Sequence, residues 1–494
     1  MKSRNPIGTL CLALIILALA TSAAHAEDKT LTRTLDPVIV SGEKLKPLWN
    51  AKTESLRLMA LQGGKLVPIP FQIDKIDPDG NYIIAMGTVP KDVIEEVDLD
   101  DRPESEKRAE RIEDFEKRRE KYRKRVAKGE LSNEAFEALR TAAYHTEQLD
   151  ALDYNDELVF MARDAGGRVA KEKWPTPEGL ELTLKDPLTN ATGWVYLLYW
   201  KAGLPPLGSD ADYVKYEPNG DIVETSMMKL DFVDDKPLIM ERIFPRRANG
   251  DQLPNIVDRF KMRIKIKPTP LFCMSLNFDE SNIEAFTVGY KDGPVRVIRR
   301  NIFWLKIAGI KLPFVPQAQV YYTFYETGLT GPAEVQNPFD PTLLLCKGSV
   351  GGGGMDFLKS MNGARVTTEA NPGTAVFDGH MSEAEENLVR DNQRWASIVR
   401  EADKTAFLIR IVQGERLRKA GVNNQLFYYD DIDMDMEPES EPGARYAGFG
   451  VNILQVPKGT FKLWFHMYVT ADYSDEKRAE YLNIVDYPVV VDVE

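Results

Sequence analysis

The sequence predicts a mainly β protein that combines one large antiparallel β-sandwich with a small N-terminal β-domain carrying an inserted, charged helical hairpin. Three observations lead to this fold class. Short runs of β-branched and aromatic residues recur along the chain, and turns rich in Pro, Gly, Asn and Asp separate them. Long stretches with helical periodicity are scarce. The 494 residues are enough for about two or three domains.

The N-terminus has the features of a cleavable signal peptide, which we place at residues 1–26. A basic start precedes an apolar run at residues 7–20, and the sequence AHA at residues 24–26 supplies the small residues that signal peptidases recognise. We expect the mature chain to begin at Glu27 and to be periplasmic or extracellular in a bacterium. No later apolar run is long enough to predict a membrane span.

The next segment, residues 27–175, is predicted to be the small β-domain, with an insertion at residues 93–150. The insertion alternates acidic and basic residues at helical spacing up to Gly129, and Ser132 then provides an N-cap for a second helix. This pattern predicts a helical hairpin. Its role is either a docking arm for a protein partner or a solvated insertion rich in ion pairs.

The large sandwich is predicted to occupy residues 176–380 and to be completed by one helix and the last strands at residues 381–494. Apolar positions favour that helix over residues 382–402, with Ser382 as its cap. The glycine run in residues 346–354 lacks the Lys-Ser/Thr ending of a phosphate-binding loop, and we interpret it as a flexible flap.

Residues 259–267 form the stretch most suggestive of function. Strand periodicity places five basic side chains on one face and Phe260, Met262, Ile264 and Ile266 on the other. Residues 240–311 hold 14 Lys/Arg against 7 Asp/Glu, a balance of +7, whereas the whole chain carries −13. An acidic chain of this kind argues against general nucleic-acid binding.

The basic face has two explanations that the sequence leaves open. It either pairs with the acidic run at residues 430–441, taken as part of a strand, or it binds an anionic polysaccharide, with arginines on carboxylates and aromatic rings against sugars. For the second explanation the candidate ligand-binding residues are Arg259, Lys261, Arg263, Lys265, Arg296, Arg300, Trp304 and Tyr322.

Metal and thiol chemistry are weakly indicated. Asp431, Asp433 and Asp435 are spaced like the first ligands of a calcium loop, but Met436 and Pro442 stand where that loop needs Gly and Glu. A looser calcium site near these aspartates remains a hypothesis, and no other cofactor is expected. Cys273 and Cys346 make no zinc pattern with the few histidines, and whether they form a disulfide stays open.

Two strings resemble strands of a known family. GPVRVIRR at residues 293–300 and the segment YAGFGVNILQVPKGTFKLWFHMYV at residues 446–469 are similar to strands of galactose-mutarotase-like β-supersandwich domains, which also occur in polysaccharide lyases. The resemblance covers about residues 176–494 and implies a supersandwich fold and carbohydrate-related activity. His380 and His466 match no motif of the family, so no catalytic residue is transferred.

The sequence therefore favours a secreted, soluble, non-catalytic binding or structural protein, with an anionic carbohydrate as the hypothetical ligand. A carbohydrate-active enzyme, either a polysaccharide lyase or a mutarotase-like isomerase, is the alternative. Nucleophile-elbow and HExxH motifs are absent from the sequence, so a reaction class cannot be assigned from motifs.

Overall fold

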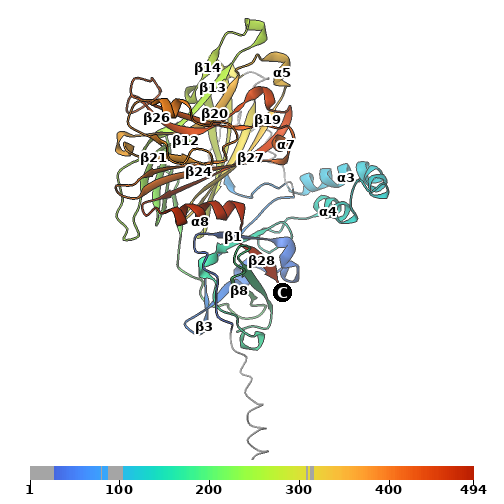
Figure 1. Ribbon diagram of the computed structural model, residues 1–494. Helices are drawn as coiled ribbons and strands as arrows, with labels where there is room; N and C mark the ends of the chain where they lie inside the picture. Colours follow the sequence, from blue (N-terminus) through green and yellow to red (C-terminus); the bar gives the residue numbers. More distant parts are fainter. Residues whose placement is uncertain (1–26, 79, 87–103, 308–309, 312–315) are drawn as a thin grey trace, which may run out of the picture.

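The computed structural model describes residues 27–78, 80–86, 104–307, 310–311 and 316–494, and the proposed signal peptide lies outside them. The described chain forms a large β lobe, a small β lobe and a helical arm that projects beside them (Figure 1). The predicted mainly β fold is confirmed. Within the described residues, no helix has the length and apolar character needed to cross a membrane.

Two antiparallel sheets face each other in the large lobe. The smaller sheet has the order β14-β13-β20-β26-β25, and the larger has the order β22-β21-β23-β24-β27-β19-β18-β16-β15-β5, with β17 paired to β16. The strands of the smaller sheet are β14 (Leu276–Phe278), β13 (Val257–Ile266), β20 (Val350–Phe357), β26 (Ala444–Asn452) and β25 (Asn424–Asp431). Those of the larger sheet are β22 (Ala375–Val376), β21 (Arg365–Thr368), β23 (Trp395–Arg400), β24 (Thr405–Gln413), β27 (Gly459–Thr470), β19 (Gly328–Asn337), β18 (Gln317–Tyr325), β16 (Arg296–Ile307), β17 (Ile310–Lys311), β15 (Ile283–Lys291) and β5 (Ala85–Met86).

A four-stranded sheet and several short helices complete this lobe. The sheet has the order β12-β11-β10-β9, and its apolar residues join the same core as the two large sheets. Its strands are β9 (Val214–Glu217), β10 (Ile222–Thr225), β11 (Met228–Val233) and β12 (Lys236–Pro245). The helices are α5 (Pro341–Leu344), α6 (Glu383–Glu386), α7 (Glu415–Lys419) and α8 (Asp475–Asp486).

The small lobe contains two sheets, with the orders β1-β6-β4 and β28-β7-β8-β2-β3. Its strands are β1 (Pro37–Ser41), β2 (Leu56–Gln62), β3 (Lys65–Pro68), β4 (Gln72–Asp74), β6 (Glu157–Met161), β7 (Gly179–Lys185), β8 (Thr192–Tyr199) and β28 (Val490–Val493). The sequence assigned β7, β8 and β28 to the large sandwich, but β8 pairs with β2, and β28 pairs with β7. Strand patterns give the faces of a strand and not its partner, so this pairing was not predictable.

The predicted hairpin is present as α3 (Glu104–Ala127) and α4 (Asn133–Tyr144), and it extends from the body in Figure 1. Ser132 caps α4 as expected, because its hydroxyl accepts the N–H of Ala135. Phe115 packs against aromatic rings of the hairpin itself, including Phe136 and Tyr144. A docking role for this arm stays a prediction.

Two predicted elements are wrong. The helix expected over residues 382–402 ends at Glu386, and Trp395–Arg400 forms β23 instead. A capping box between Ser382 and Glu385 forms, but Asn392 adopts φ 59°, which a helix cannot contain. The acidic strand ends at Asp431, so most of the acidic run lies in the loop at residues 432–441.

Arg296 joins the two lobes. Its backbone belongs to β16, whereas its guanidinium contacts Asp74 of β4 at 2.7 Å and Glu157 of β6 at 2.5 Å. It also donates to the hydroxyl of Tyr325 at 3.0 Å. The charge of this buried guanidinium is compensated by its two carboxylate partners. Arg296, a candidate ligand-binding residue, therefore holds the two lobes together and does not face a ligand.

We predict that replacing residues 106–143 by a short Gly/Ser linker leaves the main melting transition within about 2 °C of the original, because the aromatic contacts of Phe115 are internal to the hairpin. Differential scanning calorimetry of the protein measures this. A broadened or strongly lowered transition would show that the arm stabilises the body.

Candidate functional site: an apolar cavity in the large sandwich

An apolar cavity of about 620 Å³ lies between the two sheets of the large lobe. Strand β13 forms part of one wall through Phe260, Met262, Ile264 and Ile266, which are the four residues assigned to its apolar face from the sequence. The opposite wall belongs to β16, β18, β19, β24 and β27 of the larger sheet. Its lining residues include Phe303, Leu305, Val320, Val335, Ile409, Ile411, Leu463 and Phe465.

Glycines of β20 provide space beside β13. Gly353 is in register with Met262 and Gly351 with Ile264, so both face the interior. A Cβ atom at position 353 would lie 2.4 Å from Cζ of Phe260, so glycine is needed there to accommodate the ring. A Cβ atom at position 351 would make ordinary contact with Ile453 at 3.4 Å. The glycine run is therefore part of a central strand and not the flexible flap that the sequence suggested.

The chemistry of the lining is nearly uniform. Among the described residues it includes no charged side chain, and its amide groups are Asn337, Gln413 and Asn424. Gln413 donates to Asn424 at 2.8 Å, and Asn337 donates to the carbonyl of Pro457 at 3.2 Å. The hydroxyl of Tyr322 donates to the carbonyl of Leu238, and burial raises the pKa of this tyrosine. Such a lining suits an apolar chain and offers no acid or base that would titrate near neutral pH.

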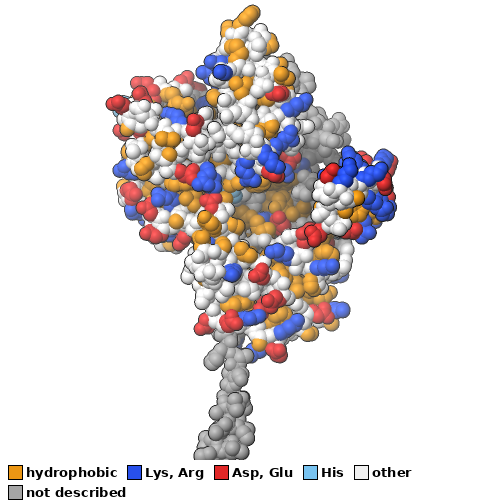
Figure 2. All heavy atoms as spheres, turned by 45° about the vertical axis from the view of Figure 1, so that its right-hand side comes forward, with side chains coloured by type: hydrophobic (Ala, Val, Ile, Leu, Met, Phe, Trp, Pro, Cys, Tyr) orange, Lys and Arg blue, Asp and Glu red, His pale blue; other side chains and the backbone are white. Residues whose placement is uncertain are grey.

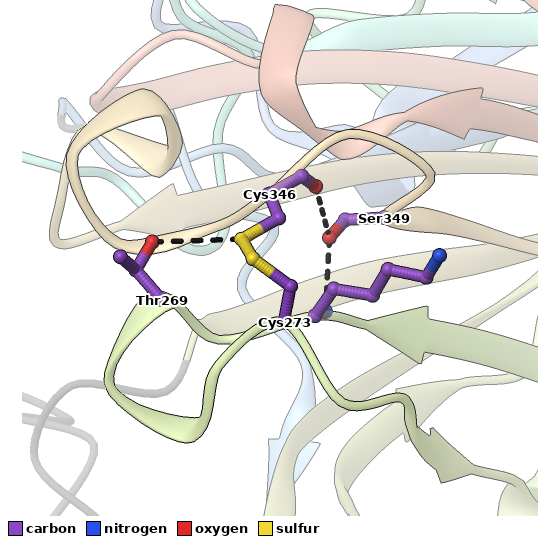
Figure 3. The surroundings of a disulfide bond; sticks show 5 residues. Thr269, Cys273, Cys346 and Ser349 are labelled. Carbon is purple, nitrogen blue, oxygen red and sulfur yellow. Dashed lines mark hydrogen bonds between the residues drawn. A yellow bond between two sulfur atoms is a disulfide. The ribbon is translucent and has the colours of Figure 1, made fainter.

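Loops form the end of the cavity near β13 and β20. Pro268 and Pro270 line it from the β13–β14 loop, and Leu344 and Leu345 line it from the end of α5 and the start of its connection to β20. The disulfide between Cys273 and Cys346 ties these two loops together (Figure 3). The hydroxyl of Ser349 donates to the carbonyl of Cys346 and accepts the N–H of Lys267. The cysteine pairing that the sequence left open thus fixes the rim of the cavity.

Apolar side chains on this rim are exposed to solvent. Phe272, next to Cys273, is 91% exposed, and Leu343 of α5 is 74% exposed. Figure 2 shows hydrophobic side chains at the tip of the large lobe, where these loops lie. Three further exposed residues share the rim, namely Leu271, Met274 and Leu344. Exposed apolar groups next to an apolar cavity are typical of a ligand entrance.

The outer face of β13 does not form an open basic surface. Lys261 is fully buried, and its ammonium lies 3.1 Å from Asp258 and 3.6 Å from Asp356. Arg259 contacts Glu241 at 3.4 Å, and Arg263 contacts Glu280 at 2.6 Å. Of the candidate residues on this strand, Lys265 is the one whose side chain is exposed.

The acidic segment meets β13 through its backbone. Lys261 donates to the carbonyls of Met436 and Pro438 at 2.8 and 2.6 Å, and Arg263 donates to that of Met436 at 2.7 Å. Burial raises the pKa of Asp356 to about 6, although the N–H of Arg445 and the Lys261 ammonium oppose this rise. The basic and acidic segments are therefore associated, but β20 and β26 separate their strands, so no direct cross-strand pairing occurs.

The other candidate residues lie apart from β13. Arg300 donates to Gln319 at 3.0 Å on the larger sheet. Trp304 packs against Phe286 on the side of β16 opposite the cavity-lining Phe303 and Leu305. Tyr322 faces the cavity. The structure thus does not gather the eight candidate residues into one groove, and the calcium hypothesis at Asp431, Asp433 and Asp435 stays a prediction.

Comparisons with known proteins establish no family for this chain. No family model matches it, and no curated protein matches it. An α-mannosidase from Enterococcus faecalis is similar with a TM-score of 0.39 and 9% identity, over 99% of this chain and 49% of that one. A putative aldose 1-epimerase from Escherichia coli is similar with a TM-score of 0.30 and 10% identity, over 50% and 97%. An α-N-acetylgalactosaminidase from Bifidobacterium bifidum has a TM-score of 0.29 and 10% identity, over 53% and 38%.

All three solved structures share only 9–10% sequence identity with this chain. The TM-scores of 0.29–0.39 are too low for any of them to define the fold or activity of this chain.

We predict that Lys261→Met lowers the free energy of unfolding by about 3–5 kcal/mol, because it leaves Asp258 and Asp356 buried without their cation. Lys265→Met on the same strand is the matched control and should change stability by no more than about 0.5 kcal/mol. Urea denaturation measures both. Equal, small effects would show that the charges of β13 are free to serve a ligand.

Proposed function

We propose that this protein binds a ligand with a long apolar chain, such as the acyl chain of a lipid, inside the cavity of the large sandwich. The observation that carries the proposal is the cavity itself, about 620 Å³ in volume and lined by apolar side chains. Ligand pockets span about 300–1,000 Å³. Folded interiors are otherwise close-packed, so a space of this size is costly unless a ligand fills it.

Charge at the rim suggests where a polar headgroup would lie. The described lining has no charged side chain, so a charged group would stay outside the cavity. Lys347, next to Cys346, is exposed at this rim. An anionic headgroup at the rim would meet the Lys347 ammonium group, and the ion pairs of Arg259 and Arg263 would stay intact.

A binding role agrees better with this chemistry than catalysis does, because the described lining offers no group that would exchange a proton near neutral pH. The anionic-polysaccharide hypothesis stays a prediction, and the ion pairs of Arg259, Lys261 and Arg263 do not favour it. We also propose that the protein acts outside the cytoplasm. The Cys273–Cys346 disulfide supports this, since such bonds persist in oxidising compartments.

The cavity proposal is tested with a fluorescent fatty-acid analogue and with mass spectrometry of lipids extracted from the purified protein. Gly351→Leu should weaken probe binding at least about tenfold, because the new side chain extends from a permitted Cβ position into the cavity. Gly208→Leu is the control, since a Cβ atom there meets nothing within 4 Å. Unchanged binding by a folded Gly351→Leu variant would exclude the cavity as the binding site.

The entrance is tested separately by following transfer of the same probe from vesicles. Phe272→Ser combined with Leu343→Ser should slow uptake several-fold without changing the final amount bound. Leu204 and Leu207, which are 94% and 91% exposed on the connection between β8 and β9, supply a matched control when both are changed to Ser. Equal uptake by the two double variants would contradict entry at the disulfide-linked rim.

A further inference from the structure

A second cluster of polar side chains lies where the helical arm rejoins the small lobe. His145 directly follows α4, Glu147 is two residues later, and Asp153 belongs to the segment that leads into β6. Nε2 of His145 lies 3.5 Å from Oε2 of Glu147 and 3.3 Å from Oδ2 of Asp153. One ligand atom from each of the three residues falls within 4.8 Å of the others.

Several atoms of this cluster are buried without a hydrogen bond. Among the described residues, neither carboxylate oxygen of Glu147 has a hydrogen-bond partner, although its side chain is only 5% exposed. The same holds for Nε2 of His145 and Oδ1 of Asp153. Desolvating a carboxylate in this way costs several kcal/mol unless something compensates. The oxygens of Glu147 are thus available to a cation placed between the three side chains, where the nearest basic group that the structure describes is the His145 ring at 3.5 Å.

The two separations from the His145 nitrogen are longer than good hydrogen bonds and match the spacing of neighbouring ligands in a tetrahedral metal site. Good N–H···O hydrogen bonds measure about 2.7–3.2 Å. Nitrogen and oxygen ligands at about 2.0–2.1 Å from one zinc ion stand about 3.3–3.4 Å apart at the tetrahedral angle. The two measured distances, 3.3 and 3.5 Å, are close to this edge length.

We propose that His145, Glu147 and Asp153 bind a divalent transition-metal ion of the zinc type. One imidazole nitrogen favours such an ion over Ca²⁺ or Mg²⁺, which prefer sites made of oxygen atoms. Two carboxylates balance the charge of the cation. Three protein ligands leave a fourth position for water.

The surroundings hold the ligands in place. The ring of Tyr154 packs edge-on against that of His145, with centroids 4.7 Å apart. The backbone N–H of Gln148 donates to Asp153 at 3.4 Å. Nearby, Lys75 pairs with Asp156 at 2.6 Å, so its charge is already matched. The bound ion would link the end of the arm to the body, independently of the cavity and its ligand.

A proton on His145 competes with the metal ion for this cluster. Burial acts to lower the pKa of His145, but the carboxylates of Asp153 and Glu147 raise this pKa to about 9. Without a metal ion the three residues would thus form an imidazolium flanked by two carboxylates. The experiment must distinguish these two states of one cluster.

The test uses the full mature chain, stripped with a chelator and titrated with Zn²⁺ by calorimetry, with metal content measured by mass spectrometry. We expect one Zn²⁺ per chain and a raised melting temperature. Glu147→Gln, which keeps the side-chain shape, should weaken binding at least about 100-fold. His380→Ala changes an exposed histidine and should have no effect. Glu437→Gln combined with Glu439→Gln controls for the exposed acidic group formed with Asp435.

A second measurement uses Co²⁺ as a spectroscopic probe. Co²⁺ bound by the wild-type chain should give the visible absorption of a tetrahedral site, and Zn²⁺ should remove it. Absence of Zn²⁺ binding, or undiminished binding by Glu147→Gln, would mean that the cluster holds an imidazolium ion pair only. Loss of the signal in the Glu437/Glu439 variant would place the ion elsewhere. Either result overturns the proposal.

Discussion

The large lobe depends on the alternation of side chains along β13. Neighbouring residues of a strand point to opposite sides, so Met262 lines an apolar cavity while Lys261 enters a polar cluster. Both sides are covered, the first by the opposing sheet and the second by the loop at residues 432–441. A strand buried on two sides is usually apolar on both. Here, carboxylates and backbone carbonyls compensate the buried charges, which lets β13 present an entirely apolar inner face.

The cavity exists because the glycines of β20 have no side chains to fill it. In a sandwich, inward side chains of both sheets normally interdigitate and fill the space between them. Gly351 and Gly353 contribute no side chain at the centre of the smaller sheet, and Phe260 occupies only part of the room. The Cys273–Cys346 bond then holds two loops together at one end. A permanent space with a covalently linked rim is a binding architecture that requires little reorganisation when a ligand enters.

Sequence patterns predicted which side chains share a face of a strand. They did not predict contacts between segments that are distant in the sequence. The inward set from Phe260 to Ile266 and the cap at Ser132 depend on local periodicity, and both were predictable. The partners of Lys261 were not, because Asp356 and Pro438 are remote in sequence. Glycines 351–354 were taken as a loop signal, since a strand with no side chains has no alternation to recognise. The cluster around His145 likewise has no recognised spacing and emerges only from the fold.

The pairing of β28 with β7 has a consequence for the order in which the chain can fold. The small lobe is built mainly from residues 37–199, yet one edge of its second sheet is completed by residues 490–493. During synthesis, that edge of β7 stays unpaired until nearly three hundred further residues have been made. Unpaired edges associate readily with other chains. A chaperone that keeps the nascent chain extended would therefore protect the small lobe in particular. Proteolytic removal of residues 490–493 would reopen the same edge in the finished protein.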